Sequence, residues 1–562
     1  MVATTVAGWA LQALGDGGAR RVFGLPGVHN MAFWRAEAPS ARVVNVRHEQ
    51  TAVYAADGWA RASGQLGAAV VTTGPGAANT VAAFGEAAMS GSPVVLVASE
   101  VPLALVEAGL QKTLHQSRDQ AAIFAPLAKA TFTPRSPSEV VSQVRAAVAT
   151  ALAFPRGPVY LDIPADVLRA PLGQVSSPAT LPGLGGADGA AGGEGAVVGP
   201  AGAYGPGAGG SLDDVARAIA SAASVVIWAG GGVVASGADA ELAELACVLR
   251  APVVTSFSAR GILGPDHECD MVLPPHEPEV EEMLAGAGLL LAIGTDLDGM
   301  MTKNATLRLP PKIFDINVDR ERTEAGYQGV VPVIADAKVA LRYLLETAKP
   351  RSVGPADQLA ELQSRVWARL AADPRTSQAV AFLRCSAAAA GGKAVIVNDM
   401  TIPGYWLGNY YRAPGPRTVQ YPVGWGTLGY ALPASIGAAF GSDKPVLTVC
   451  GDGGFMFAVG ELATIVQEDL PITILLVDDG GYGMLRYGNA PAAGPVPGAD
   501  LVRPDFLKLA EAFGIRASKV TSVGPELERA IRQGLESGQP RMVLCEVSLF
   551  PPKTTSPRWR EP

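Results

Sequence analysis

Cysteine is scarce in this chain, and its few cysteines are scattered. There are five among 562 residues (Cys247, Cys269, Cys385, Cys450 and Cys545), with no CxxC pair. This spacing argues against a disulfide framework or a zinc site and is typical of a protein kept in a reducing cytoplasm. The N-terminus lacks a basic start followed by a long apolar core, so no signal peptide is expected. We therefore expect a cytoplasmic protein.

An excess of positive charge is also missing. The net charge is −8 and the isoelectric point is near 5.4, which leaves no basic stripe for nucleic acid. The longest uncharged stretch, residues 419–442, contains Pro422, Pro433 and repeated glycines, which argues against a membrane span. We expect that stretch to be a buried loop and helix beside a small-molecule ligand.

What is present is a repeated alternation of helical and strand patterns, typical of doubly wound parallel sheets. Apolar residues make up 48% of the chain and charged residues only 17%, which indicates large buried cores. The fold class expected is α/β, with three doubly wound parallel-sheet domains. The expected divisions are a first domain at 1–170, a Gly/Ala/Pro-rich linker at 171–210, a central domain at 211–350, a third domain at 358–550 and a tail at 551–562.

The third domain carries a pattern for binding a metal-bound diphosphate. An apolar strand at 445–450 leads into Gly451-Asp452-Gly453-Gly454, a helical pattern follows from about 459 to 467, and a second strand at 472–477 precedes Asp479. Parallel strands end at the same edge of a sheet, so the two carboxylates are expected to converge on one hard cation. Glycine amides and a helix N-terminus would face a phosphate. Taken alone, the glycines fit an ordinary strand-turn-helix equally well.

The first domain offers a matching group of residues at strand ends. Glu49 follows a strand, and two loops rich in glycine and proline, residues 24–29 and 73–79, end two others. Such loops let the backbone approach a flat ring closely. Glu49 alone could be a helix cap and each loop a plain turn. Their meeting at one edge favours a site.

Together these segments resemble the thiamine diphosphate (ThDP) enzymes of the acetolactate synthase and 2-oxo acid decarboxylase superfamily. The resemblance covers the whole chain apart from residues 172–210. It rests on Arg47-His48-Glu49, residues 74–79, Gly426-Thr427-Leu428-Gly429 and the motif from Gly451 to Asp479. Segments 23–29 and 114–120 look closest to the branch of 5-guanidino-2-oxopentanoate decarboxylase-like enzymes.

The resemblance implies roles for individual residues. Glu49 matches the glutamate that shares a proton with the aminopyrimidine N1′ of ThDP. Leu428 matches the bulky residue under the bent cofactor, and the carbonyl of Gly426 would accept from N4′. Asp452, Asp479 and the carbonyl of Gly481 match the ligands of Mg²⁺.

Other residues follow from the same resemblance. His29 and His115 are expected near the reacting carbon as proton carriers, and Gln116 aligns with a glutamine that faces the substrate. The remaining residues expected to contact the cofactor are Pro26, Gly27, Thr73, Asn79, Thr401, Gly453, Gly454, Tyr482, Gly483 and Met484.

Three departures from the family pattern bear on the reaction. Asp479 stands where the family usually has asparagine, which suggests tighter Mg²⁺ binding or tolerance of Ca²⁺. A segment beginning at Met400 replaces a diphosphate-gripping loop and leaves Thr401 as its side-chain donor. Gly488 occupies the position of a tryptophan that shapes the acceptor pocket of acetolactate synthases, so acetolactate formation is in doubt.

The function expected is decarboxylation of a 2-oxo acid with ThDP and Mg²⁺, the carbanion being captured by a proton or by a second carbonyl. Acetolactate synthase proper and a non-catalytic ThDP-binding scaffold or sensor are the alternatives. Residues 292–296 are compatible with a nucleotide, but FAD is not predicted; no GxGxxG follows an early strand, which argues against an NAD enzyme. The family pattern implies at least a homodimer with sites between subunits, and a homotetramer as the usual assembly.

Overall fold

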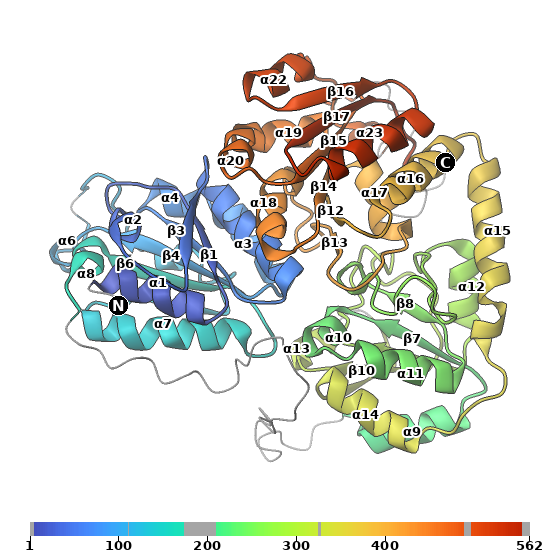
Figure 1. Ribbon diagram of the computed structural model, residues 1–562. Coiled ribbons are helices and arrows are strands. Elements are labelled where there is room, and N and C mark those ends of the chain that lie inside the picture. Colours follow the sequence, from blue (N-terminus) through green and yellow to red (C-terminus); the bar gives the residue numbers. More distant parts are fainter. Residues whose placement is uncertain (1–4, 111, 173–208, 324–326, 488–495, 553–562) are drawn as a thin grey trace.

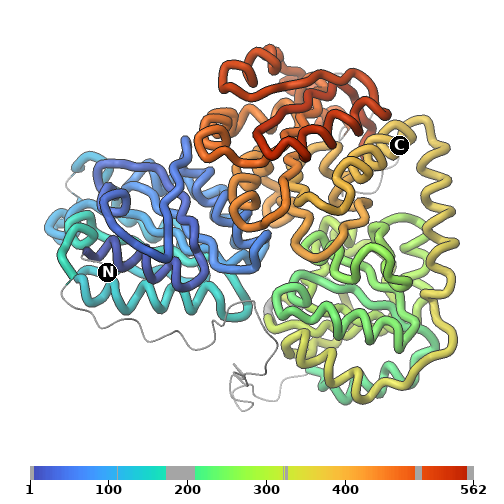
Figure 2. The backbone as a smooth tube through the Cα atoms, in the orientation of Figure 1, coloured from blue at the N-terminus to red at the C-terminus, as the bar shows by residue number. Residues whose placement is uncertain are grey.

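The computed structural model describes residues 5–110, 112–172, 209–323, 327–487 and 496–552. The chain forms three lobes, each built on a parallel sheet (Figures 1 and 2). No helix in these ranges is both long and apolar enough to cross a membrane. Almost all of the expected linker 171–210 and tail 551–562 lies outside the described residues, as does Gly488.

The first lobe has a six-stranded sheet. Its strands are β1 (Arg21–Gly24), β2 (Arg42–Asn45), β3 (Gly67–Val71), β4 (Val94–Glu100), β5 (Ala130–Phe132) and β6 (Val159–Pro164), in the order β2-β1-β3-β4-β6-β5. Its helices are α1 (Val6–Asp16), α2 (Ala32–Arg35), α3 (Glu49–Ser63), α4 (Pro75–Ala78), α5 (Val81–Met89), α6 (Leu103–Glu107), η1 (Ala121–Ile123), α7 (Pro137–Leu152) and α8 (Ala165–Arg169).

The central lobe has a five-stranded sheet. Its strands are β7 (Val225–Ala229), β8 (Val253–Thr255), β9 (Leu289–Ile293), β10 (Ile313–Asn317) and β11 (Val330–Ile334), in the order β11-β10-β9-β7-β8. Its helices are α9 (Leu212–Ser221), α10 (Gly231–Ser236), α11 (Asp239–Leu249), η2 (Phe257–Ala259), α12 (Pro278–Gly286), α13 (Arg320–Thr323) and α14 (Ala337–Thr347). After η3 (Pro355–Gln358), α15 (Leu359–Ala372) leads into the third lobe (Figure 1).

The third lobe again has six parallel strands. They are β12 (Val395–Asn398), β13 (Val419–Gln420), β14 (Val446–Gly451), β15 (Ile472–Asp478), β16 (Arg516–Val520) and β17 (Arg541–Glu546), in the order β13-β12-β14-β15-β17-β16. Its helices are α16 (Ser377–Ala390), α17 (Ile402–Tyr410), α18 (Ala431–Gly441), α19 (Asp452–Phe455), η4 (Met456–Glu461), α20 (Leu462–Gln467), α21 (Gly483–Tyr487), α22 (Phe506–Ala512) and α23 (Pro525–Glu536).

Helices cover both faces of each sheet, which is why the inner strands are continuous apolar runs. In β4 every residue is buried: Leu96 and Ala98 pack with α3, whereas Val95 and Val97 pack with α1 and α7 on the other face. A parallel strand buried on both faces has no polar side to alternate with. The expected doubly wound α/β class, with three such domains, is confirmed.

Two helices join the first and third lobes at backbone distance. A Cβ added to Gly58 of α3 would lie 2.1 Å from the carbonyl oxygen of Ala434, and one added to Gly437 of α18 would lie 1.8 Å from that of Ala55. Only glycine leaves room for such an approach. The pair fixes α3, which begins at Glu49, against the helix that follows the loop of Gly426 and Leu428.

Replacing Gly437 by alanine should therefore destabilise the protein. The new methyl group overlaps a carbonyl oxygen on a buried helix, and we expect the free energy of unfolding to fall by about 1–3 kcal/mol or more. Gly286→Ala is the matched control, because nothing lies within 4 Å of a Cβ there. Its effect should stay within about 0.5 kcal/mol. Equal melting temperatures for the two variants would contradict the close packing.

Candidate active site

The two strands expected to carry the metal ligands do end together. β14 and β15 are adjacent and parallel, and Gly451 pairs with Val477. The helix expected at about 459–467 is present as α20, but a short helix that the sequence did not indicate, α19, already begins at Asp452 and is separated from α20 by η4, which is kinked at Ala458. Tertiary packing here overrides the poor helix propensity of two consecutive glycines. Asp452 thus sits at a helix start at the carboxyl edge of the sheet.

Asp452 and Asp479 form an acidic pair in which Asp452 is buried and Asp479 is partly buried. Asp452 is 3% exposed, and its Oδ1 is buried with no hydrogen-bond partner among the described residues. Burial, followed by the charges of Asp479 and Asp478, raises the pKa of Asp452 to about 7. Burial also raises the pKa of Asp479 to about 6. An unpartnered carboxylate oxygen beside a second acid fits a hard divalent cation such as Mg²⁺.

Glycines let other side chains approach the backbone around this pair closely. A Cβ on Gly451 would meet Thr401 Oγ1 at 2.7 Å, and one on Gly453 would meet the Tyr482 ring at 2.6 Å. A Cβ on Gly454 would lie 3.3 Å from Leu428 Cδ1, and one on Gly483 would overlap Asp479 Oδ2 at 2.0 Å. The structure thus brings Thr401, Leu428, Asp479 and Tyr482 together around residues 451–454. The diphosphate and metal roles of these residues remain predictions.

Arg486 holds the loop that follows β15. Its guanidinium donates to the carbonyls of Asp479 at 2.9 Å and Gly480 at 2.8 Å, and to Asp500 Oδ1 at 2.9 Å. Gly481 has φ +143°, and a Cβ there would lie 2.0 Å from the carbonyl oxygen of Ala499. The loop that includes the expected Gly481 ligand is therefore fixed on both sides. Met484, just beyond it, is partly buried against the core.

Two buried acids in this region were not among the expected residues. Asp399, 1% exposed, accepts from the amides of Met400 at 2.8 Å and Gly429 at 3.0 Å, and its burial raises its pKa to about 6. Glu86 accepts from the amides of Gly424 at 3.0 Å and Trp425 at 2.9 Å. Both position the loop that carries Gly426 and Leu428. Asp399 directly follows β12, so the strand-end signal used for Asp452 would have found it.

In the first domain, Glu49 is the first residue of α3 but not its cap. The cap is His48, whose Nδ1 accepts from the Gln50 amide at 3.2 Å. Glu49 is 9% exposed, and Asn79 Nδ2 donates to its Oε2 at 3.0 Å. The helix-cap alternative for Glu49 is therefore wrong, because its carboxylate does not cap α3.

The expected loops meet beside Glu49. A Cβ on Gly76 would lie 3.4 Å from Glu49 Oε1, and Gly74, with φ +65°, leaves room for the carbonyl oxygen of His115. The loop containing Pro26 is closed by Asn30, whose Oδ1 accepts from the Gly27 amide at 2.7 Å. Thr73 is fully buried, with its hydroxyl 3.0 Å from Ser99 Oγ.

His29 and His115 lie against each other on these loops. Their ring centroids are 5.5 Å apart, edge to face, and both Nδ1 atoms are buried without a partner among the described residues. Burial, and then the neighbouring His115, lowers the pKa of His29. Gln116 is used differently: its amide donates to the carbonyls of Gly109 at 3.0 Å and Leu105 at 3.3 Å. Gln116 thus braces its own loop, and its contact with substrate stays a prediction.

A cavity of about 560 Å³ lies where the three lobes meet, lined at the central sheet by Gly231, Ser256, Gly294 and Asn317 and on the other side by Arg417. The residues 292–296 expected to be compatible with a nucleotide reach this cavity. We do not predict that FAD binds here. Absorbance of the purified protein in the visible range tests whether a flavin is bound.

Cation binding at the acidic pair should depend on pH. Because both pKa values are raised, the protonated carboxyls stabilise the metal-free fold at low pH, and this stability is lost as pH rises through about 6 to 7. A cation must displace those protons at low pH but not at high pH. We expect the rise in melting temperature caused by Mg²⁺ to be larger at about pH 8 than at about pH 5.5. A rise that is the same at both values would contradict the site.

Comparisons with known proteins agree with this geometry. The chain matches the models for the thiamine pyrophosphate enzyme N-terminal TPP binding domain at residues 4–123, the central domain at 212–344 and the C-terminal TPP binding domain at 399–547. A probable 2-ketoarginine decarboxylase from Pseudomonas aeruginosa is 33% identical over 97% of this chain and 94% of its own. A probable acetolactate synthase large subunit from Methanocaldococcus jannaschii is 29% identical over 95% and 90%.

The fold has a counterpart among solved structures. The ThDP-dependent 4-hydroxybenzoylformate decarboxylase of Rhodococcus jostii superposes with a TM-score of 0.77 at 22% identity, over 97% of this chain and 99% of that one. Thiamine pyrophosphate and thiamine diphosphate are the same cofactor, so the resemblance drawn from the sequence is confirmed. With matched models across three domains and a relative one-third identical along nearly its whole length, this chain belongs to the thiamine pyrophosphate enzymes and has a decarboxylase or acetolactate synthase-like activity.

Proposed function

We propose that the protein decarboxylates a 2-oxo acid with ThDP and Mg²⁺ and releases the product after a proton is added. Bound ThDP supplies a carbon nucleophile that adds to a keto group and an electron sink for the carbanion left when CO₂ departs. The protein must activate that nucleophile, hold the cation and deliver a proton.

Glu49 suits the first task. It is nearly buried at the start of α3, and Asn79 occupies only its Oε2. A desolvated carboxylate makes a strong hydrogen bond and shares its proton with a ring nitrogen such as the aminopyrimidine N1′. Asp452 and Asp479 suit the second task, because Asp452 Oδ1 has no partner among the described residues and Asp479 has only the Arg486 guanidinium 3.7 Å away to offset its charge.

The observation that carries the choice of proton capture is the pair His29 and His115. Two imidazoles in contact, each with a buried nitrogen that has no partner among the described residues, can hold and pass a proton. Capture by a second carbonyl, as in acetolactate synthase, is the second candidate, favoured by the relatives of that name.

Product identification separates the two candidates. The enzyme with ThDP and Mg²⁺ is given a panel of 2-oxo acids, including 2-ketoarginine because of the relative named for it. CO₂ with an equal amount of aldehyde supports proton capture, and a 2-hydroxyketone supports carboligation. In a single turnover, His115→Gln should slow aldehyde release more than CO₂ release, since it removes the proton carrier and not the activation. No turnover of any panel member would favour the non-catalytic scaffold.

The proposal includes a homodimer, and the usual tetramer, with each site shared between subunits. Exposed apolar side chains flank both halves of the site: Val28 (73% exposed) and Leu114 (77%) in the first domain, Trp425 (47%) and Phe457 (57%) in the third. Apolar side chains gathered beside a functional site indicate a covered surface.

The proposal also includes a cytoplasmic location, since all five cysteines are free thiols.

Subunit mixing tests the shared site. If Glu49 and Asp452 of one site come from different chains, a heterodimer of Glu49→Gln and Asp452→Asn subunits has one intact site. A reassociated equal mixture should then regain about a quarter of wild-type activity. Each variant alone, taken through the same dissociation, is the control. A mixture no more active than its components would show that each chain completes its own site.

A further inference from the structure

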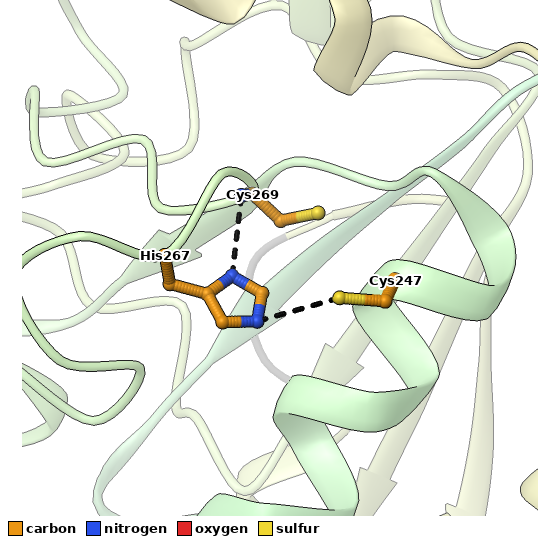
Figure 3. Close-up of side chains that lie close together, drawn as sticks. All are labelled: Cys247, His267 and Cys269. Atoms are coloured by element: carbon orange, nitrogen blue, oxygen red, sulfur yellow. Dashed lines mark hydrogen bonds between the residues drawn. The ribbon is translucent and has the colours of Figure 1, made fainter.

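The central domain brings together two thiols and an imidazole that the catalytic machinery does not use. Cys247 lies near the end of α11, and His267 and Cys269 lie on the segment that leads to the bridge between Val253 and Asp270 (Figure 3). Their sulfur and nitrogen atoms all lie within 4.8 Å of one another. The cysteines are scattered along the sequence, which argued against a disulfide or a metal site, but the fold brings Cys247 and Cys269 close together.

Hydrogen bonding fixes the form of the His267 ring. Its Nδ1 accepts from the backbone amide of Cys269 at 3.2 Å, so in the neutral ring Nε2 carries the hydrogen. Nε2 faces Cys247 Sγ at 3.5 Å (Figure 3) and donates to it. A donor to sulfur stabilises the thiolate, which is the reactive form of cysteine.

The two thiols differ in access. Cys247 is exposed and Cys269 is fully buried. Burial, and then the nearby Cys247, raises the pKa of Cys269 to about 12, so Cys269 stays protonated. An exposed thiol that accepts a hydrogen bond, beside a buried thiol, is an arrangement in which the first reacts with an oxidant and the second closes a disulfide.

The same three residues include zinc-type ligands, but the ring orientation disfavours a metal. Zinc at Nε2 needs a lone pair there and a hydrogen on Nδ1, and that hydrogen would face the Cys269 amide hydrogen. Among the described residues, the group of His, Cys, Asp or Glu side chains that could hold a metal ion here has three members, Cys247, His267 and Cys269. Structural zinc sites usually have four protein ligands.

We propose that Cys247 and Cys269 form a reversible disulfide in response to a peroxide, with His267 as a positioning residue. The thiolate sulfur of Cys247 attacks a peroxide oxygen; an S–O bond forms, the O–O bond breaks, and the leaving hydroxide takes a proton to become water. Cys269 then gives up its proton, its sulfur bonds to that of Cys247, and the S–O bond breaks to release a second water. Two thiols are oxidised and hydrogen peroxide is reduced to two waters.

Peptide mapping of the wild-type protein with ThDP and Mg²⁺ tests this. After treatment with graded hydrogen peroxide and blocking of free thiols, the Cys247 and Cys269 peptides should appear joined, two hydrogens lighter than their sum. Dithiothreitol should restore them. Cys385, half-buried with its thiol donating to Gly524 O at 3.4 Å, should remain reduced at the same peroxide concentration.

Variants separate the roles. Cys269→Ser should leave a sulfenic acid at Cys247 that dimedone traps, and Cys385→Ser should behave as wild type. His267→Gln should slow oxidation of Cys247 by about tenfold or more. Without the imidazole donor, the partial negative charge at the C-terminal end of α11 disfavours the thiolate form of Cys247.

Two results would overturn the proposal: Cys385 oxidised as readily as Cys247, or one tightly bound zinc per chain that must be removed before Cys247 reacts. The wild-type peptide map and its metal analysis decide the matter even where a variant fails to fold.

Discussion

Replacing Glu49 by glutamine should lower kcat/KM by about 10²- to 10⁴-fold, because the carboxylate that shares a proton with the cofactor is lost. The change is nearly isosteric, and an amide in the same place still accepts the 3.0 Å hydrogen bond from Asn79. Binding of ThDP should therefore change little. Steady-state kinetics on the substrate identified by the panel, with a ThDP titration followed by intrinsic fluorescence, measure the two quantities.

The control for this variant is Glu244→Gln. Glu244 is an exposed carboxylate on α11, remote from strand ends of the first domain, and its loss should leave kcat/KM within a factor of about two. If Glu49→Gln kept wild-type turnover, Glu49 would be a structural helix-start residue and the enzyme would need another activator. If it lost ThDP binding as well, the loss of activity would no longer identify proton sharing.

Asp452→Asn should abolish cofactor-dependent activity through the loss of the cation. We expect Mg²⁺ affinity to fall by about 10- to 100-fold, since one of two carboxylate ligands becomes neutral. The metal-free variant should meanwhile be more stable than wild type at about pH 8, because it no longer ionises a buried carboxyl whose pKa is about 7. Thermal melts with and without Mg²⁺, combined with a calorimetric metal titration, check both effects.

Asp479→Asn is the matched comparison. Asparagine keeps one ligand oxygen and, by the family pattern, is the usual residue there, so the loss of affinity should be smaller than for Asp452→Asn. Unchanged Mg²⁺ affinity would end the idea that Asp479 tightens the site. An Asp452→Asn protein with wild-type metal affinity would place the cation elsewhere.

The sequence was most informative where a strand is buried on both faces. β14 and β15 are unbroken apolar runs, and their positions, together with the adjacency of Asp452 and Asp479, could be predicted. Edge strands were harder: β16 is exposed along most of its length and β13 has two residues, so neither leaves an apolar pattern. Exposure at a sheet edge removes the very signal that identifies a strand.

Residues defined by tertiary neighbours also escaped prediction. Asp399 carries the same strand-end signal as Asp452, but the amides of Met400 and Gly429 that turn toward it could not be predicted. Cys247 and His267 are twenty positions apart, and only the packing of α11 beside β8 brings them together. Asp452 was placed correctly at a strand end and the helix at about 459–467 was found as α20, but the short α19 was not, because two glycines conceal a helix that packing imposes.

The glycine contact between α3 and α18 has a consequence for recombination among relatives. The two helices meet through backbone at Gly58 and Gly437, so each fits only a partner with matching small residues. A chimera that takes its first lobe from one relative and the rest from another would place a foreign helix in that joint. The smallest exchangeable module is therefore the first lobe with α18 included, although residues 64–430 separate the two helices.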